Sequence, residues 1–145
     1  MKAGMLAFFL LGSVASLGQT PTVPRDPCDQ KNFSNRDSRD CYGREQKKVN
    51  AQIDSLVESI ANEWINDAQK ERKYGPVVTA SMRKAAASLR QSQRSWRLYR
   101  DQYCKAVKYG YDIGSGAGTA HERCLYEVAN ARLRQLQTNF VTRVY

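Results

Sequence analysis

The residues best suited to chemistry are one histidine and four cysteines, Cys28, Cys41, Cys104 and Cys124. The cysteines are widely separated, which favours disulfides over a zinc site, whose ligands usually come in close pairs. His121 would need a partner to act as a general base, and the sequence offers none, so it is predicted to be an exposed residue in the first turn of a helix. Glu122 and Glu127 are five residues apart on the same predicted helix, so they point in different directions. No catalytic residue, metal or cofactor is therefore expected.

The beginning of the chain is typical of an exported protein. Lys2 precedes an apolar run from Met5 to Leu11, and small residues follow. A membrane span needs about 20 apolar residues, so this shorter run favours a cleaved signal peptide at 1–18 over a membrane anchor. A flexible leader at 19–27 and a single domain at 28–145 are predicted to follow. In a periplasmic or secreted protein, the even number of cysteines predicts two disulfides.

Three segments repeat apolar residues at helical spacing, and no segment shows convincing strand alternation. The first helix is predicted from about Cys41 to Lys73, where Gly75 and Pro76 end it. The second is predicted from Val77 or Thr79 to Tyr109. The third is predicted to open at Thr119, because Thr119 and Glu122 have the spacing of a capping box. Ser34 and Asp37 have a similar spacing and are a further candidate for a helix start.

These elements predict an all-α fold, in which an antiparallel helical hairpin packs against a third helix. Trp64 and Trp96 are the largest candidates for its core. The apolar side of the second helix is predicted to contain Met82, Ala85, Leu89, Trp96, Tyr103 and Val107.

The hairpin topology brings the four cysteines to one end of the bundle. The start of the first helix lies beside the end of the second, and Cys124 follows in the third. Four cysteines allow three connectivities. Cys28–Cys41 with Cys104–Cys124 is favoured because each bridge closes a local loop. Cys41–Cys104 with Cys28–Cys124 is compatible with the same clustering.

Two surfaces are candidates for binding a partner. The first is the glycine-rich loop at 111–118, where Tyr109, Tyr111 and Ile113 beside the glycines could insert into a partner's cleft; a plain connector is the alternative. The second is a basic stripe on the second helix, which meets an anionic polymer or surface in one interpretation and only solvent in the other. The basic residues of the stripe are Arg83, Arg90, Arg94, Arg97, Lys105 and Lys108. At 100° per residue they lie within an arc of about 80° around the helix axis, and Asp101 lies in the same arc.

The second helix also contains the run from Gln93 to Cys104, with Trp96, Tyr99, Arg100 and Asp101 inside it. With the flanking cysteines and the glycine-rich loop, this run resembles the LprI-like lysozyme-inhibitor family of bacterial envelope proteins, in which it reads Q-x-x-W-x-x-Y-R-D-x-x-C. The resemblance covers about 28–136. It implies a small, helical, disulfide-bonded, exported domain without catalytic activity.

The resemblance and the basic stripe lead to one hypothesis for function each. The first is a protein that blocks a cell-wall hydrolase such as lysozyme through the glycine-rich loop. The second is an envelope module that docks on an anionic polymer through the basic stripe; nucleic acid is not expected as a partner of an exported protein. The helical wheel places Gln93, Trp96, Arg100 and Cys104 on the inner face, where Arg100 is expected to meet an acidic or carbonyl partner, and leaves Arg94 and Arg97 in solvent. The formal charge of +9 disfavours a basic lysozyme as the target.

Overall fold

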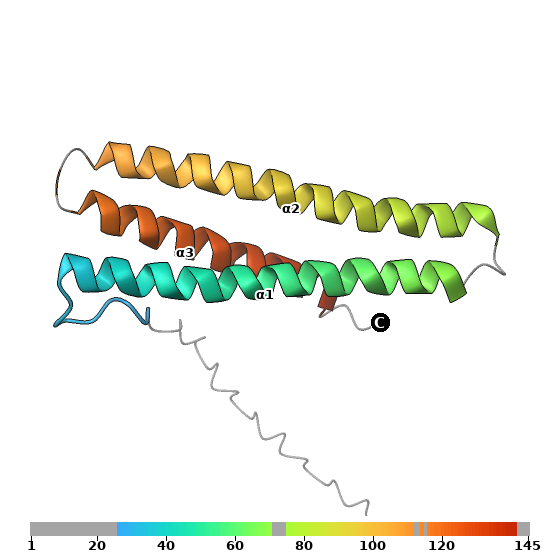
Figure 1. The fold of residues 1–145 in the computed structure, drawn as a ribbon, viewed down its shortest axis with the longest axis horizontal. Coiled ribbons are helices and arrows are strands. Elements are labelled where there is room, and N and C mark those ends of the chain that lie inside the picture. Colours follow the sequence, from blue (N-terminus) through green and yellow to red (C-terminus); the bar gives the residue numbers. More distant parts are fainter. Residues whose placement is uncertain (1–25, 71–74, 112–113, 115, 142–145) are drawn as a thin grey trace, which may run out of the picture.

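A computed structural model describes residues 26–70, 75–111, 114 and 116–141. Three long helices pack side by side, α1 (Asn35–Lys70), α2 (Pro76–Gly110) and α3 (Ala117–Leu136), and the short π-helical segment η2 (Gln137–Val141) follows α3 (Figure 1). The described residues contain no strand. The predicted all-α hairpin with a third helix is confirmed. The predicted signal peptide, the leader up to residue 25 and Ile113 lie outside the described residues.

The first helix begins six residues before its predicted start at Cys41. The side chains of Ser34 and Asp37 explain this start, because each accepts a hydrogen bond from the other's backbone N–H. The hydrogen bond from the Ser34 hydroxyl to the carboxylate lowers the pKa of Asp37. Residues 35–40 are therefore already helical. The Cys28–Cys41 disulfide attaches the segment before α1 to a position inside the helix and not to its first residue.

The second helix has nearly its predicted bounds. Gly75 precedes it with φ of 101°, a conformation that glycine adopts without strain, and Pro76 occupies the first turn. The third helix differs, since it begins at Ala117 and no side chain caps its first turn. Thr119 lies inside the helix and its hydroxyl donates to the carbonyl of Asn35, 2.7 Å away. The predicted capping box is therefore wrong, because this tertiary contact takes the hydroxyl.

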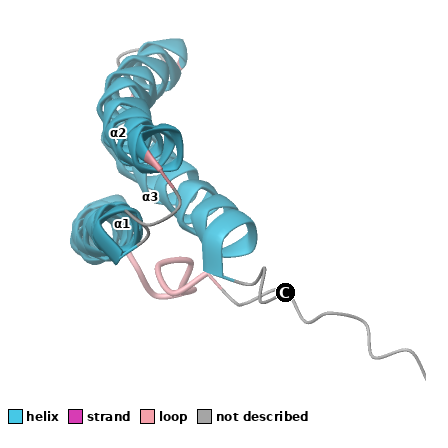
Figure 2. Cartoon of the chain, turned by 90° about the vertical axis from the view of Figure 1, so that its right-hand side faces the viewer, coloured by secondary structure: helices cyan, strands magenta, loops and turns pink. Residues whose placement is uncertain are grey.

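The three helices differ in length, and this shapes the molecule. α3 has 20 residues, whereas α1 has 36 and α2 has 35. It therefore accompanies only the part of the hairpin near the α2–α3 connection (Figure 1). Seen along the bundle, the helices form a triangle (Figure 2).

The main apolar core lies along the middle of the bundle. Its buried members are Val49, Ile53, Val57, Ile60, Leu89, Ala129 and Leu136. Trp64 and Trp96 pack against this core but stay partly exposed, so the prediction that they are its largest members is wrong. The largest fully buried side chain is that of Tyr42.

The buried side of α2 is also rotated from the predicted apolar stripe. Ala85 and Tyr103 are exposed, whereas Ala86, Gln93, Arg100 and other residues are buried. Polar side chains can occupy this face because their hydrogen-bonding groups find partners there.

Both disulfides follow the favoured local pairing, Cys28–Cys41 and Cys104–Cys124. Each joins residues at the end of the bundle where α1 begins, α2 ends and α3 begins, and we call this end the disulfide pole (Figure 1). The prediction that the cysteines cluster at one end is confirmed, and the pairing Cys41–Cys104 with Cys28–Cys124 is excluded. Among the described helices, none is both long and apolar enough to cross a membrane.

Candidate functional site

The inward residues of the motif run are held by polar contacts. Arg100 is only 8% exposed. Its Nη1 donates to Oδ1 of Asn50 at 2.7 Å, its Nη2 donates to Oδ1 of Asp101 at 2.6 Å, and its guanidinium lies 5.1 Å from the centre of the Trp96 ring. Gln93 is buried as well and accepts a hydrogen bond from Arg132. Gln93 and Arg100 thus lie on the inner face of α2, and the partners of Arg100 are the carboxylate of Asp101 and the side-chain carbonyl of Asn50.

A second polar network fixes the disulfide pole. The Tyr42 hydroxyl donates to Oδ2 of Asp26 at 2.7 Å and accepts from Nε of Arg123 at 2.8 Å. Burial, and next the hydrogen bond to Asp26, raise the pKa of Tyr42 to about 12. The network joins the segment before α1, α1 itself and α3. Sequence reasoning missed it, because Asp26 and Arg123 lie far from Tyr42 in the chain and no spacing connects them.

The glycine-rich loop leaves the bundle at this pole. The Cys104–Cys124 disulfide joins α2 and α3 a short distance from the two ends of the loop. Tyr109 is 68% exposed and Tyr111 is 61% exposed, and Nζ of Lys105 lies 5.9 Å from the centre of the Tyr109 ring. Two aromatic rings are therefore available to a partner beside a covalently closed loop.

The basic stripe on α2 is partly neutralised by α1. Arg90 donates to both carboxylate oxygens of Glu58 and to the side-chain oxygen of Asn62. This bidentate contact holds the pKa of Glu58 below its usual value. Arg97 forms an ion pair with Asp54. The four other cations of the stripe, Arg83, Arg94, Lys105 and Lys108, have exposed side chains, and Arg94 donates to Gln91 of its own helix.

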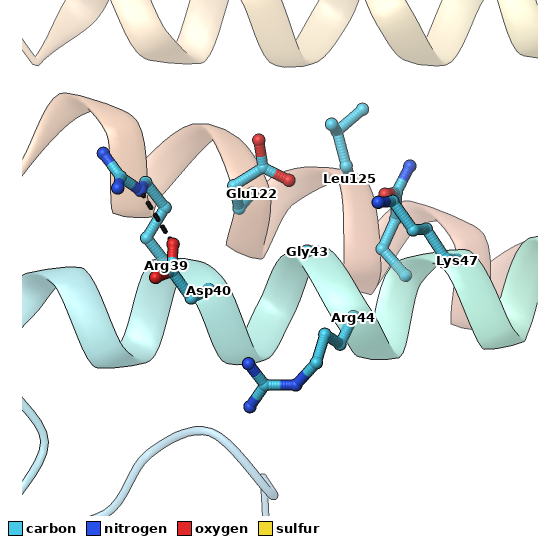
Figure 3. A pocket seen from close by; sticks show the side chains of 8 residues that line it. Arg39, Asp40, Gly43, Arg44, Lys47, Glu122 and Leu125 are labelled. Carbon is cyan, nitrogen blue, oxygen red and sulfur yellow. Dashed lines mark hydrogen bonds and ion pairs between the residues drawn. The ribbon is translucent and has the colours of Figure 1, made fainter.

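A shallow hollow of about 600 Å³ lies between α1 and α3 near the disulfide pole (Figure 3). The helices approach closely at Gly43, where an added Cβ atom would lie 3.5 Å from Oε2 of Glu122. Figure 3 shows Arg39 hydrogen-bonded to Asp40, and Arg44 directed away from α3. The full lining is Arg39, Asp40, Gly43, Arg44, Gln46, Lys47, Glu122 and Leu125.

The hollow presents charges of both signs but no catalytic arrangement that we recognise. His121 lies beside it, with Nδ1 3.5 Å from Oε1 of Glu122. The histidine is half-buried and stands in the second turn of α3, so the prediction of an exposed first-turn position is wrong, because α3 begins two residues earlier than expected. Among the described residues, no group of three or more His, Cys, Asp or Glu side chains is placed to hold a metal ion.

The comparison with protein-family models decides the family. The model described as lysozyme inhibitor LprI matches residues 28–136. The chain belongs to the LprI lysozyme-inhibitor family. Searches of curated proteins and of solved structures found no match.

The segment that matches the LprI family is also the disulfide-bonded helical unit of the structure. It begins at Cys28, the first bridged cysteine, and ends at Leu136, the last residue of α3 and a buried one. Membership in the LprI family suggests a lysozyme-inhibitor-like, non-catalytic role that involves binding a hydrolase. Together with the two disulfides, it also suggests a location outside the cytoplasm.

Proposed function

We propose that this protein is an exported, non-catalytic inhibitor that binds a cell-wall hydrolase of the lysozyme type through its disulfide pole. The observation that carries the proposal is the pair of exposed tyrosines, Tyr109 and Tyr111, beside a loop closed by Cys104–Cys124. Tyrosine is enriched at protein interfaces because it buries a large rigid ring and keeps a polar hydroxyl. A loop that is restrained before binding loses less conformational entropy in the complex.

Charge determines which hydrolases suit this inhibitor. The chain has a formal charge of +9, so a strongly basic hydrolase is repelled at long range and associates slowly. A less basic wall hydrolase is repelled less, and an acidic one is attracted. We therefore expect the strongest inhibition with the least basic enzymes, and we expect added salt to reduce the difference between enzymes.

Turbidimetric lysis of cell walls tests the proposal, with a panel of hydrolases of different charge and a stoichiometric excess of purified protein. The double variant Tyr109→Ala and Tyr111→Ala should weaken inhibition at least about tenfold, as expected when interface aromatic anchors are removed. Val77→Ala is the control, because Val77 is 76% exposed at the opposite end of α2. The proposal fails if no enzyme in the panel is inhibited, or if the tyrosine variant inhibits as well as the control.

The second candidate function is docking on an anionic envelope polymer through the basic stripe. Its support is the group of four exposed cations, Arg83, Arg94, Lys105 and Lys108, on one side of α2. Arg90 and Arg97 contribute less, because Glu58 and Asp54 compensate their charge.

Co-sedimentation with purified cell-wall polymer over a salt series separates this function from the first. The triple variant Arg94→Glu, Lys105→Glu and Lys108→Glu should lose binding, and the wild type should bind less as salt rises. The double variant Arg90→Glu and Arg97→Glu provides an internal comparison, since Glu58 and Asp54 already compensate these two charges and the double variant should matter less. Binding that ignores salt, or that survives the triple variant, excludes the stripe as the docking surface.

A further inference from the structure

The outward side of α2 is poor in charge. Within α2, all of which the structure describes, Lys84 is the one charged side chain in an arc of about 140° that extends around the helix from Leu98 to Tyr103. In a chain of which 26% is charged, a solvent-facing surface of this kind needs a reason. Depletion of charge together with enrichment of tyrosine is the compositional signal of a protein interface. We call this surface the charge-poor face and define it by Ser81, Ala85, Ser88, Leu98, Tyr99 and Tyr103.

The two halves of the charge-poor face differ in size. The half nearer Gly75 exposes the small side chains Ser81, Ala85 and Ser88, with Lys84 as its one charged side chain. The half nearer the disulfide pole exposes Leu98 at 67%, Tyr99 at 57% and Tyr103 at 48%. The Tyr99 and Tyr103 rings stack with centroids 5.7 Å apart and an interplanar angle of 16°, so they form one rigid ridge. The face therefore has a raised half and a low half.

We propose that the charge-poor face binds the same face of a second copy of this chain, with the two α2 helices antiparallel. A two-fold interface requires a surface that complements itself, and an antiparallel pair sets the raised half of each copy on the low half of the other. Charge limits where two copies can meet. Two copies that each bear +9 repel one another over most of their surfaces, and within α2 this arc offers the lowest density of charge, with Lys84 as its one charged side chain.

The register follows from matching large to small. Placing Tyr99 opposite Ser88 of the second copy also brings Tyr103 to the level of Ala85, which lies on the same side of the seam, so a large ring meets a small side chain at both places. The two-fold axis then passes near Gln93, at the middle of the 35-residue helix, so the two helices overlap along their full length. The disulfide poles lie at opposite ends of the resulting dimer.

The size of the contact indicates a weak dimer. A helix of this length is about 50 Å long, and a strip about 10 Å wide gives roughly 1,000 Å² over both copies. That is near the lower limit for a specific interface, so dissociation constants in the micromolar range are expected. Salt screens the repulsion between the two basic copies, so the dimer should tighten as salt rises from about 50 mM to about 500 mM.

Sedimentation equilibrium over a concentration and salt series tests the proposal with the full chain. The wild type should double its mass at micromolar concentrations, more readily at high salt. Tyr99→Lys with Tyr103→Lys should weaken the dimer at least about a hundredfold, because it removes two anchors and adds repulsion. Gln52→Lys with Ser59→Lys adds the same charge to exposed positions of α1 and should leave most of the dimer intact. Circular dichroism confirms that every variant is folded.

A size-only variant tests the register. Ser88→Tyr puts a large ring where the raised half of the partner must fit, and it should weaken the dimer at least about tenfold. Ser59→Tyr on α1 should not. The proposal is overturned if the wild type stays monomeric throughout, or if the dimer survives the Tyr99 and Tyr103 substitutions. If the wild type is monomeric and the Tyr99 and Tyr103 substitutions abolish hydrolase inhibition, the charge-poor face binds the hydrolase and the dimer proposal is overturned.

Discussion

The two ends of the helical hairpin are stabilised in different ways. At the disulfide pole, three helices, two disulfides and the buried Tyr42 network act together. Toward Gly75, α3 no longer accompanies the hairpin (Figure 1). The buried residues there include the small side chains of Ala68 in α1 and Ala86 in α2. Beyond α3, Phe140 of η2 packs edge-on against Trp64. Covalent and buried polar restraints are thus concentrated at the end that bears the candidate binding loop.

Restraints are therefore most numerous at the pole where binding is proposed. Tyr109 and Tyr111 stand at the end of α2 beside these restraints, whereas the far end of the hairpin has fewer of them and can open locally at lower cost. If so, changes at the disulfide pole should cost far more stability than changes in the rest of the hairpin. The following measurements test that ranking.

The largest effect is expected from Cys104→Ser with Cys124→Ser. This bridge spans 20 residues of sequence, and its loss should reduce the free energy of unfolding by about 2–4 kcal/mol, because the unfolded chain regains conformational freedom. Denaturant unfolding measures the change. A loss well below this range would mean that helix packing alone holds the pole together.

Alkaline pH should produce the next largest effect, through Tyr42. The pKa of Tyr42 is raised to about 12 in the folded protein. The stability that its neutral hydroxyl contributes to the fold is therefore fully present below pH 10 and is lost as pH rises toward 12. The shift corresponds to a loss on the order of 2 kcal/mol. The difference in stability between the wild type and Tyr42→Phe should therefore shrink above pH 10. A constant difference would contradict the buried network.

At neutral pH, Tyr42→Phe itself should cost about 1–2 kcal/mol. The substitution keeps the ring and removes the hydroxyl that joins Asp26 to Arg123, so both lose a partner near the pole. Tyr103→Phe is the matched control, because Tyr103 is exposed and its loss of a hydroxyl should be nearly neutral. Thermal unfolding of the two variants provides the comparison.

The smallest effect is expected away from the pole, from Glu58→Gln. This change breaks the exposed ion pair with Arg90, and such pairs contribute little in water. Because the folded pKa of Glu58 is lowered, the contribution exists above its ordinary pKa and is lost as pH falls through the lowered value. The unfolding midpoint should change only slightly, and the change should vanish in acid. An effect as large as that of Tyr42→Phe would overturn the ranking of the two regions.

Much of this organisation could be predicted from local sequence patterns. Helical spacing identified the three helices, the Gly75–Pro76 break located the hairpin turn, and hairpin topology placed the cysteines together. The helical wheel also oriented Gln93 and Arg100 toward the interior. The Tyr42 network and the pairing of Arg90 with Glu58 were not predicted, because each partner is fixed by how two helices dock and not by spacing along one of them. The assignment of Thr119 as a cap failed for the same reason.

The sequence by itself determined the helices, the likeness to the LprI family and the residues that could form disulfides, since these depend on periodicity and on residue type over short distances. Tertiary structure alone decided which charges are compensated, which tyrosine is buried and which four remain exposed along α2 and its end. The physical reason is that a side chain's environment depends on groups brought near it by packing, and those groups lie many residues away in the chain.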